Sequence, residues 1–172
     1  MKKNELKKDN YNIRNILGLQ RKNNNEFYTP KEPIIELIKI LKIPKNKVIW
    51  CPFDTEKSEF VKVLKENGYK VIFSHIDNGK DFYEYEPNEK WDLIISNPPF
   101  SQKRLLIERC ESFNKPFCLL YGATIFSQSM GNTLNRCQFL FIQRNIKFTT
   151  KTDEVKSFQC AWLFNKGFPW IK

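Results

Sequence analysis

The chain has 172 residues, of which 41% are hydrophobic, so it can form one folded domain with its own core but has no room for a second domain of ordinary size. Its formal charge of +10 at pH 7 favours a polyanionic partner, most simply nucleic acid, although lysine-rich surfaces also serve solubility. No apolar stretch could span a membrane, no signal peptide is visible, and the five cysteines form no CxxC pair, so we expect a cytoplasmic protein with reduced thiols and no metal site.

The first 25 residues are polar and rich in lysine and asparagine. We expect a basic, mobile segment over residues 1–25, with at most a short helix at residues 11–19. This segment is either an arm that touches nucleic acid or a solvated tail. The folded domain is expected to follow as residues 26–172.

A helix is predicted over residues 30–42, because its apolar residues recur at helical spacing. Thr29 is expected as its N-cap, Pro30 suits the first helical position, and Glu32 would complete a capping box. The start of the folded domain is therefore an amphipathic helix.

The next segment predicts a strand, a turn, a helix and a second strand, at residues 47–51, 51–55, 56–67 and 69–75. The helix has apolar residues on one face and stops at Gly68. A strand–helix–strand unit of this length is the usual opening of a parallel, Rossmann-like sheet.

A short apolar strand over residues 91–96 leads into Asn97-Pro98-Pro99-Phe100. The prolines end the strand and stiffen a loop at its carboxyl end, where ligands bind in open α/β sheets. An exocyclic amine such as adenine N6 is a poor nucleophile, because its lone pair is delocalised into the ring. The Asn97 side-chain oxygen and a nearby carbonyl can accept its N–H groups and free that lone pair, while Phe100 can stack on the base.

The remaining elements are expected to be a helix, a strand, a weakly helical polar connection and two strands, at residues 103–113, 117–121, 127–135, 137–142 and 158–164. A polar loop over residues 145–157 is expected to join the last two strands.

The tetrapeptide Asn97-Pro98-Pro99-Phe100 resembles motif IV of the amino-methyltransferases that use S-adenosylmethionine (SAM), and Tyr28-Thr29-Pro30 resembles their motif X, which helps hold SAM. The resemblance runs from about Phe27 to the end of the chain and is to small, phage-type DNA adenine-N6 methyltransferases. It implies an α/β, Rossmann-like catalytic domain over residues 26–172, with a mostly parallel sheet, an antiparallel closing strand pair and no target-recognition domain.

The same resemblance places cofactor-binding residues after the first predicted strand, with a departure from the family pattern. Pro52 and Phe53 match motif I, but Cys51 stands at the usual acidic position and the glycines are absent. Those glycines normally let the backbone approach the methionine part of SAM. Asp54 or Thr55 would have to substitute.

Two further cofactor positions follow the second predicted strand. His75 stands where the family has an acidic residue that binds the ribose, so it either accepts a ribose hydroxyl or is a structural histidine. Asp81-Phe82 resembles motif III, which borders the donor methyl and the base. Only a short segment precedes Trp91, so we expect the usual third strand to be truncated or missing.

The resemblance implies direct methyl transfer from SAM to adenine N6 in DNA, with Asn97 and the Pro98 carbonyl orienting the amine. Contacts to phosphate are expected from a set of basic residues, Lys103, Arg104, Arg136, Arg144 and Lys147. We expect the segment Ser127–Arg136 to sense the local sequence context. Two alternatives remain open: a different amine acceptor, such as adenine in RNA, and an inactive, methyltransferase-fold binding or inhibitory protein. The sequence predicts no oligomeric state.

Overall fold

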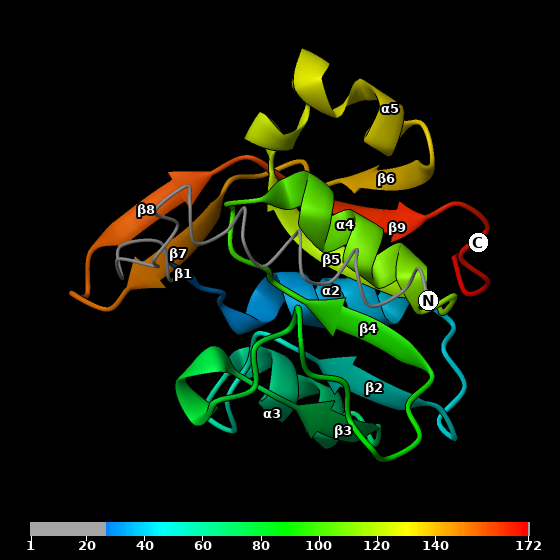
Figure 1. The fold of residues 1–172 in the computed structure, drawn as a ribbon. Helices are drawn as coiled ribbons and strands as arrows, with labels where there is room; N and C mark the ends of the chain where they lie inside the picture. The colour runs from blue at the N-terminus through cyan, green and yellow to red at the C-terminus, as the bar shows by residue number, and fades with distance from the viewer. Residues whose placement is uncertain (1–26, 172) are drawn as a thin grey trace.

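The computed structural model describes residues 27–171. The basic segment of residues 1–25 and the short helix expected within it lie outside the described residues. Residues 27–171 form two β-sheets with helices packed around the larger one (Figure 1).

The larger sheet has six strands in the order β3-β2-β4-β5-β9-β6 (Figure 1). The strands are β2 (Val48–Cys51), β3 (Lys70–Phe73), β4 (Leu93–Ser96), β5 (Phe117–Gly122), β6 (Cys137–Phe141) and β9 (Cys160–Asn165). The first four strands in spatial order are parallel, whereas β9 runs antiparallel to both β5 and β6. This topology confirms the predicted fold class, an α/β, Rossmann-like fold with a mostly parallel sheet and an antiparallel closing pair.

Helices cover both faces of the six-stranded sheet, and each face has its own apolar core. α2 (Lys31–Ile40) and α3 (Glu59–Glu66) supply side chains to one core, and α4 (Lys103–Ser112) supplies side chains to the other. β4 serves both cores, because its side chains alternate between the faces: Ile95 belongs to the first and Ile94 to the second. All four residues of β4 are buried, as expected for a central parallel strand.

A smaller, antiparallel sheet has the order β1-β7-β8. Its strands are β1 (Phe27–Tyr28), β7 (Ile146–Thr150) and β8 (Val155–Phe158). The expected polar loop over residues 145–157 is therefore wrong. Ile146 and Phe148 alternate with polar residues along β7 and are buried in the core, and this period of two outweighs the polar composition of the segment.

Two details at the helix ends also differ from expectation. Thr29 is not an N-cap: Pro30 occupies that position, and the start of α2 has no side-chain cap. The helix expected from residue 56 begins three residues later, because Ser58 stands at its N-cap and Thr55 N donates to Ser58 Oγ in a preceding turn.

The expected loss of the third strand is confirmed. Between β3 and β4, the described chain has one 3₁₀ helix, η1 (Ile76–Asn78), and no strand. The weakly helical connection after β5 contains η2 (Ala123–Ile125), η3 (Gln128–Met130) and α5 (Gly131–Leu134). No helix of residues 27–171 is long and apolar enough to cross a membrane.

Candidate active site

Asn97 directly follows β4, and its side-chain amide is fixed by one hydrogen bond. Its Nδ2 donates to the backbone oxygen of Phe27 in β1, over 3.1 Å. Because the donor side of the amide is held in this way, the direction of Oδ1 is set as well. Oδ1 is buried and has no hydrogen-bond partner among residues 27–171. Pro98 is buried and Pro99 half-buried, which keeps this loop close to the sheet.

Some buried polar side-chain atoms have no hydrogen-bond partner, and Asn97 Oδ1 in this loop is one of them. In the described part of the chain there are four of them: Thr29 Oγ1, Asn97 Oδ1, Gln102 Oε1 and Tyr121 Oη. Gln102 follows Phe100 by two residues, the Tyr121 ring lies 6.3 Å from that of Phe100, and Thr29 follows the Phe27 carbonyl by two residues. Native proteins rarely leave such atoms unpaired, so these four atoms are candidates for contact with a polar ligand.

Phe100 lies within a group of aromatic rings. The Phe27 ring stacks on it, with centroids 5.5 Å apart and an interplanar angle of 28°. Phe158 of β8 meets it at 90° and 6.2 Å. A Cβ added to Gly122 at the end of β5 would lie 4.0 Å from Phe100 Cζ, so the ring sits close to that strand end. One face of Phe100 is therefore covered by Phe27.

The turn after β2 is joined to β4 through a buried carboxyl group. Ser96 Oγ donates to Asp54 Oδ2 over 2.5 Å, and Asp54 N donates to the carbonyl of Ser74 over 3.1 Å. Burial raises the pKa of Asp54 to about 6, and hydrogen bonds from Ser96 and Ser58 oppose that rise. Asp54 is therefore ionised near neutral pH but is easily protonated in mild acid.

Cys51, at the position where an acidic residue was expected from the resemblance, does not supply a charge. Its side chain is buried, and burial with the nearby Asp54 carboxylate raises the pKa of the thiol well above its usual value. It stays a neutral thiol. Asp54 is the acidic group at this end of β2, three residues later than the family pattern, while Pro52 is buried and Phe53 packs on Phe82 at 4.8 Å.

His75 follows β3 and caps η1. Its Nδ1 accepts a hydrogen bond from Asp77 N over 3.2 Å, and this contact occupies that ring nitrogen. This contact gives the imidazole a structural role, and Nε2 is the atom left for a ligand. The prediction that it binds a ribose stays a prediction.

The Asp81-Phe82 pair is placed by local structure. Asp81 Oδ1 accepts from Tyr83 N over 3.0 Å, and Phe82 is only 2% exposed, packed 5.6 Å from the Trp50 ring. Phe82 is thus a core residue beneath Phe53. Tyr28, in contrast, is 49% exposed at the edge of the smaller sheet.

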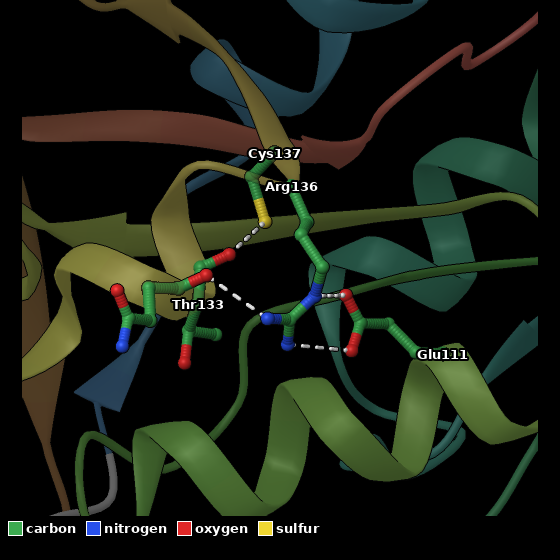
Figure 2. A network of polar contacts seen from close by, with 5 residues as sticks. Glu111, Thr133, Arg136 and Cys137 are labelled. Carbon is green, nitrogen blue, oxygen red and sulfur yellow. Dashed lines mark hydrogen bonds and ion pairs between the residues drawn. The ribbon is translucent and has the colours of Figure 1, made fainter.

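The five basic residues predicted to contact phosphate fall into two groups. Arg136 binds Glu111 of α4 through Nε and Nη2, at 2.9 and 3.0 Å, and donates from Nη1 to the Asn132 carbonyl (Figure 2). Arg144 pairs with Glu36 at 2.6 Å. These two cations have carboxylate partners, which neutralise their charges in the free protein.

Lys103 and Arg104, at the start of α4, have neutral partners. Lys103 Nζ donates to the carbonyl and hydroxyl oxygens of Thr124, at 2.9 and 3.2 Å, and Arg104 donates to the Ser129 carbonyl. A carbonyl does not neutralise a cation, so both charges remain available to a phosphate. Lys147 lies exposed on β7.

Sequence reasoning missed four residues of this site: Phe27, Ser96, Gln102 and Tyr121. The contacts of Phe27, Ser96 and Tyr121 join residues distant in the sequence: β1 pairs with residues 149–150, Ser96 bonds Asp54, and the Tyr121 ring lies near that of Phe100. The only local signal was that Phe27 directly precedes Tyr-Thr-Pro and Ser96 directly precedes Asn-Pro-Pro.

No protein-family model and no curated protein matches this chain. Among solved structures, it is similar to a precorrin-6y C5,15-methyltransferase from Geobacter metallireducens, at 11% identity and a TM-score of 0.44, covering 81% of this chain and 92% of that one. It is also similar to a release-factor-specific protein-(glutamine-N5) methyltransferase from Alicyclobacillus acidocaldarius, at 13% identity and 0.40, covering 77% and 88%. With such low scores, neither similarity assigns an activity or a substrate.

Proposed function

We propose that this protein is a SAM-dependent methyltransferase that acts on the N6 amine of adenine in DNA. The observation that carries the proposal is the buried, unpaired Oδ1 of Asn97, held in a fixed direction at the carboxyl end of β4. Three further buried polar atoms of residues 27–171 also lack a partner. A stiff acceptor that lacks a partner in the free protein is what an amine substrate requires.

Asn97 and Pro98 position the amine. Oδ1 of Asn97 accepts one N–H of the substrate, and the Pro98 carbonyl accepts the other. This pair draws the nitrogen toward tetrahedral geometry, so that its lone pair points away from the ring. Since the prolines hold the loop and Phe27 holds the Asn97 amide, little rearrangement is needed during the reaction.

Three residues at the ends of β2, β3 and α2 have the chemistry to hold SAM, which supplies an electrophilic methyl group when bound. Asp54 offers a carboxylate that suits the cofactor's ammonium group, Thr29 offers an unpaired hydroxyl, and His75 Nε2 remains for a ribose hydroxyl. These groups fit the polar parts of SAM. The turn at residues 51–54 brings no glycine, so side chains rather than backbone must make the contacts there.

Phe100 is proposed to stack on the adenine, and this requires a change at Phe27. In the present structure the Phe27 ring occupies one face of Phe100. We expect the incoming base to displace the Phe27 side chain, while the Phe27 backbone, which pairs with Thr150 and accepts from Asn97 Nδ2, stays in place. A base in a duplex would also have to leave the stack.

A second candidate, an inactive binding protein on the same fold, is favoured by the glycine-free turn and by the cover that Phe27 gives to Phe100. Calorimetric titration of the full chain with SAM separates the two. The enzyme predicts saturable SAM binding and a rise in melting temperature by linkage. A folded protein that binds no SAM would contradict the enzyme and favour the second candidate.

The identity of the molecule that accepts the methyl group can be tested with the same purified protein. Transfer of labelled methyl groups to matched DNA, RNA and peptide substrates, followed by identification of the modified base, should give N6-methyladenine in DNA. A methylated RNA or glutamine amide would keep the methyltransferase and replace its substrate.

A further inference from the structure

Three phenylalanines form an exposed aromatic cluster at one edge of the six-stranded sheet. Phe126 follows η2, and Phe139 and Phe141 belong to the edge strand β6. Phe126 lies 4.9 Å from Phe139 and 5.4 Å from Phe141, nearly parallel to the latter at 29°. Phe126 is 42% exposed and Phe141 is 62% exposed, which is unusual for side chains of this size. We call Phe126, Phe139 and Phe141 the aromatic platform.

The register of the sheet places Phe141 of the aromatic platform near the carboxyl ends of the strands, where the candidate active site also lies. Phe141 and Tyr121 are both paired with Ala161 of β9, from opposite sides, and so lie in one row across the sheet. Residues in one row point to the same face. The Tyr121 ring is in turn 6.3 Å from Phe100. Phe100, the buried Tyr121 and Phe141 are therefore linked by one ring contact and one row of the sheet, in which Ala161 separates Tyr121 from Phe141.

Two cations are held by residues close to Phe126 in the sequence. Lys103 is bonded to Thr124, two residues before Phe126, and Arg104 is bonded to Ser129, three residues after it. Both cations have neutral oxygen partners, as described above. The surface beside the platform thus combines exposed rings with unneutralised cations, the combination that binds single-stranded nucleic acid, in which bases stack and phosphates meet the charges.

We propose that the aromatic platform binds unpaired nucleotides that flank the target adenine, with Lys103 and Arg104 contacting their phosphates. This inference rests on the proposed function, because it names a second contact of the same substrate. A nucleic-acid strand is the occupant that the charge favours. The flanking cations and the overall charge of +10 attract a polyanion and repel a second copy of this chain. Since every base has a π-face, the contact is tolerant of sequence.

The test measures binding of fluorescein-labelled single strands of DNA and RNA, of one sequence, to the full-length protein. The double variant Phe126→Leu/Phe141→Leu retains apolar bulk but lacks the π-face, and should weaken binding about tenfold, within the range for loss of base stacking. The double variant Phe126→Tyr/Phe141→Tyr retains the rings and should bind as the parent does. The DNA and RNA arms report which strand is preferred.

Val155→Ala is the matched control, because Val155 is equally exposed at 62% but belongs to the smaller sheet. It should leave affinity for the single strands unchanged. Equal affinity of the leucine variant and the parent would overturn the proposal. So would a concentration-dependent dimer, seen by sedimentation, that the leucine variant abolishes, because the platform would then be a protein interface.

Calorimetric titration with SAM keeps this inference separate from the proposed function. The leucine variant should bind SAM as the parent does, since neither residue lies among the proposed cofactor groups. If the parent binds no SAM but the leucine variant loses affinity for single strands, the proposed function fails and the platform stands. If SAM binds and is used but the leucine variant retains full affinity, the platform fails alone.

Discussion

Ser96 donates a 2.5 Å hydrogen bond to Asp54, and this single contact joins the end of β4 to the turn after β2. Ser96 immediately precedes Asn97, so the proposed cofactor carboxylate and the proposed amine acceptor belong to strand ends that are tied together. The bond is buried, and it positions both groups at the carboxyl edge of the sheet. We therefore expect a substitution on one side of this hydrogen bond to affect the residues on the other side as well.

The raised pKa of Asp54 predicts a stability that depends on pH. Its pKa is about 6 in the folded protein and 3.8 as the ordinary value, so the folded state binds more protons between these limits. The free energy of unfolding therefore falls as pH rises through that window and stays lower above it. Asp54→Asn removes this dependence, and should be more stable than the parent near neutral pH by up to about 3 kcal/mol, since one pKa unit is about 1.4 kcal/mol.

Denaturant unfolding at a series of pH values measures this difference. The free energies of unfolding of the parent and of Asp54→Asn should converge toward pH 4. An unaltered pH profile in the variant would show that the pKa of Asp54 is not raised in the folded protein, and a parent whose stability instead rises with pH through this window would mean that a cation pairs with Asp54. SAM affinity of the parent should rise with pH through about 6, as the carboxylate forms, and Asp54→Asn should lack that rise.

Asn97 can be tested by separating its acceptor from its donor. Asn97→Ala removes Oδ1, and should lower kcat about a hundredfold or more, in the range seen for loss of a preorganised transition-state contact, while SAM affinity changes little. Asn97→Asp retains the acceptor but loses the hydrogen bond to the Phe27 carbonyl, so it should keep more activity than the alanine variant. Steady-state kinetics with calorimetry provide both readouts, and equal activities of the two variants would assign the role of Asn97 to its donor.

Phe27 is predicted to compete with the substrate base for Phe100. Phe27→Ala removes the stacked ring but leaves the backbone carbonyl that holds Asn97. A site that is open in only a fraction of the molecules has its apparent affinity reduced by that fraction. Removal of the covering ring should therefore lower KM for the nucleic acid several-fold. The variant also loses packing against Phe148 and Phe158, so its melting temperature must be recorded. A KM that rises in a folded variant would make Phe27 part of the binding surface.

Substitutions of Lys103 and Arg136 are expected to have different effects on the salt dependence of DNA binding. Lys103→Ala should weaken DNA binding and lower the slope of log affinity against log salt concentration by about one, as loss of one phosphate contact does. Arg136→Ala should leave that slope unchanged, because its guanidinium is already paired with Glu111 (Figure 2). Its expected cost is up to about 1 kcal/mol of stability, the range for an exposed ion pair. A reduced slope for the Arg136 variant would show that this ion pair opens on DNA.

Much of the fold could be predicted from the sequence, because many of its elements are set by patterns among neighbouring residues. The apolar run of β4, the period of α2 and the missing third strand are of this kind. The hairpin of β7 and β8 was missed, since its polar composition masked an alternation of only two buried residues, Ile146 and Phe148. The capping box predicted with Thr29 is absent: Pro30 stands at the N-cap, and the buried Thr29 hydroxyl has no partner among residues 27–171.

The candidate site was predicted in part, through residues that adjoin recognisable motifs. Asn97 and Phe100 lie where the motif places them, at a strand end. The pairing of Arg136 with Glu111, and the cover of Phe100 by Phe27, depend on residues distant in sequence. No pattern within one segment can reveal which cation already has a carboxylate partner. Such contacts decide which predicted residues remain available to a ligand.

The missing third strand leaves β3 as the outer strand of the sheet, and this has a consequence for behaviour in concentrated solution. An outer strand presents unpaired N–H and C=O groups to which another chain can add. β3 is only four residues long and begins with the exposed Lys70, and Lys65 Nζ lies 5.2 Å from the centre of the Phe73 ring. Short length and lysine are features that discourage intermolecular strand addition. Neutralising these lysines, for example by acetylation, should therefore make the protein prone to self-association along β3.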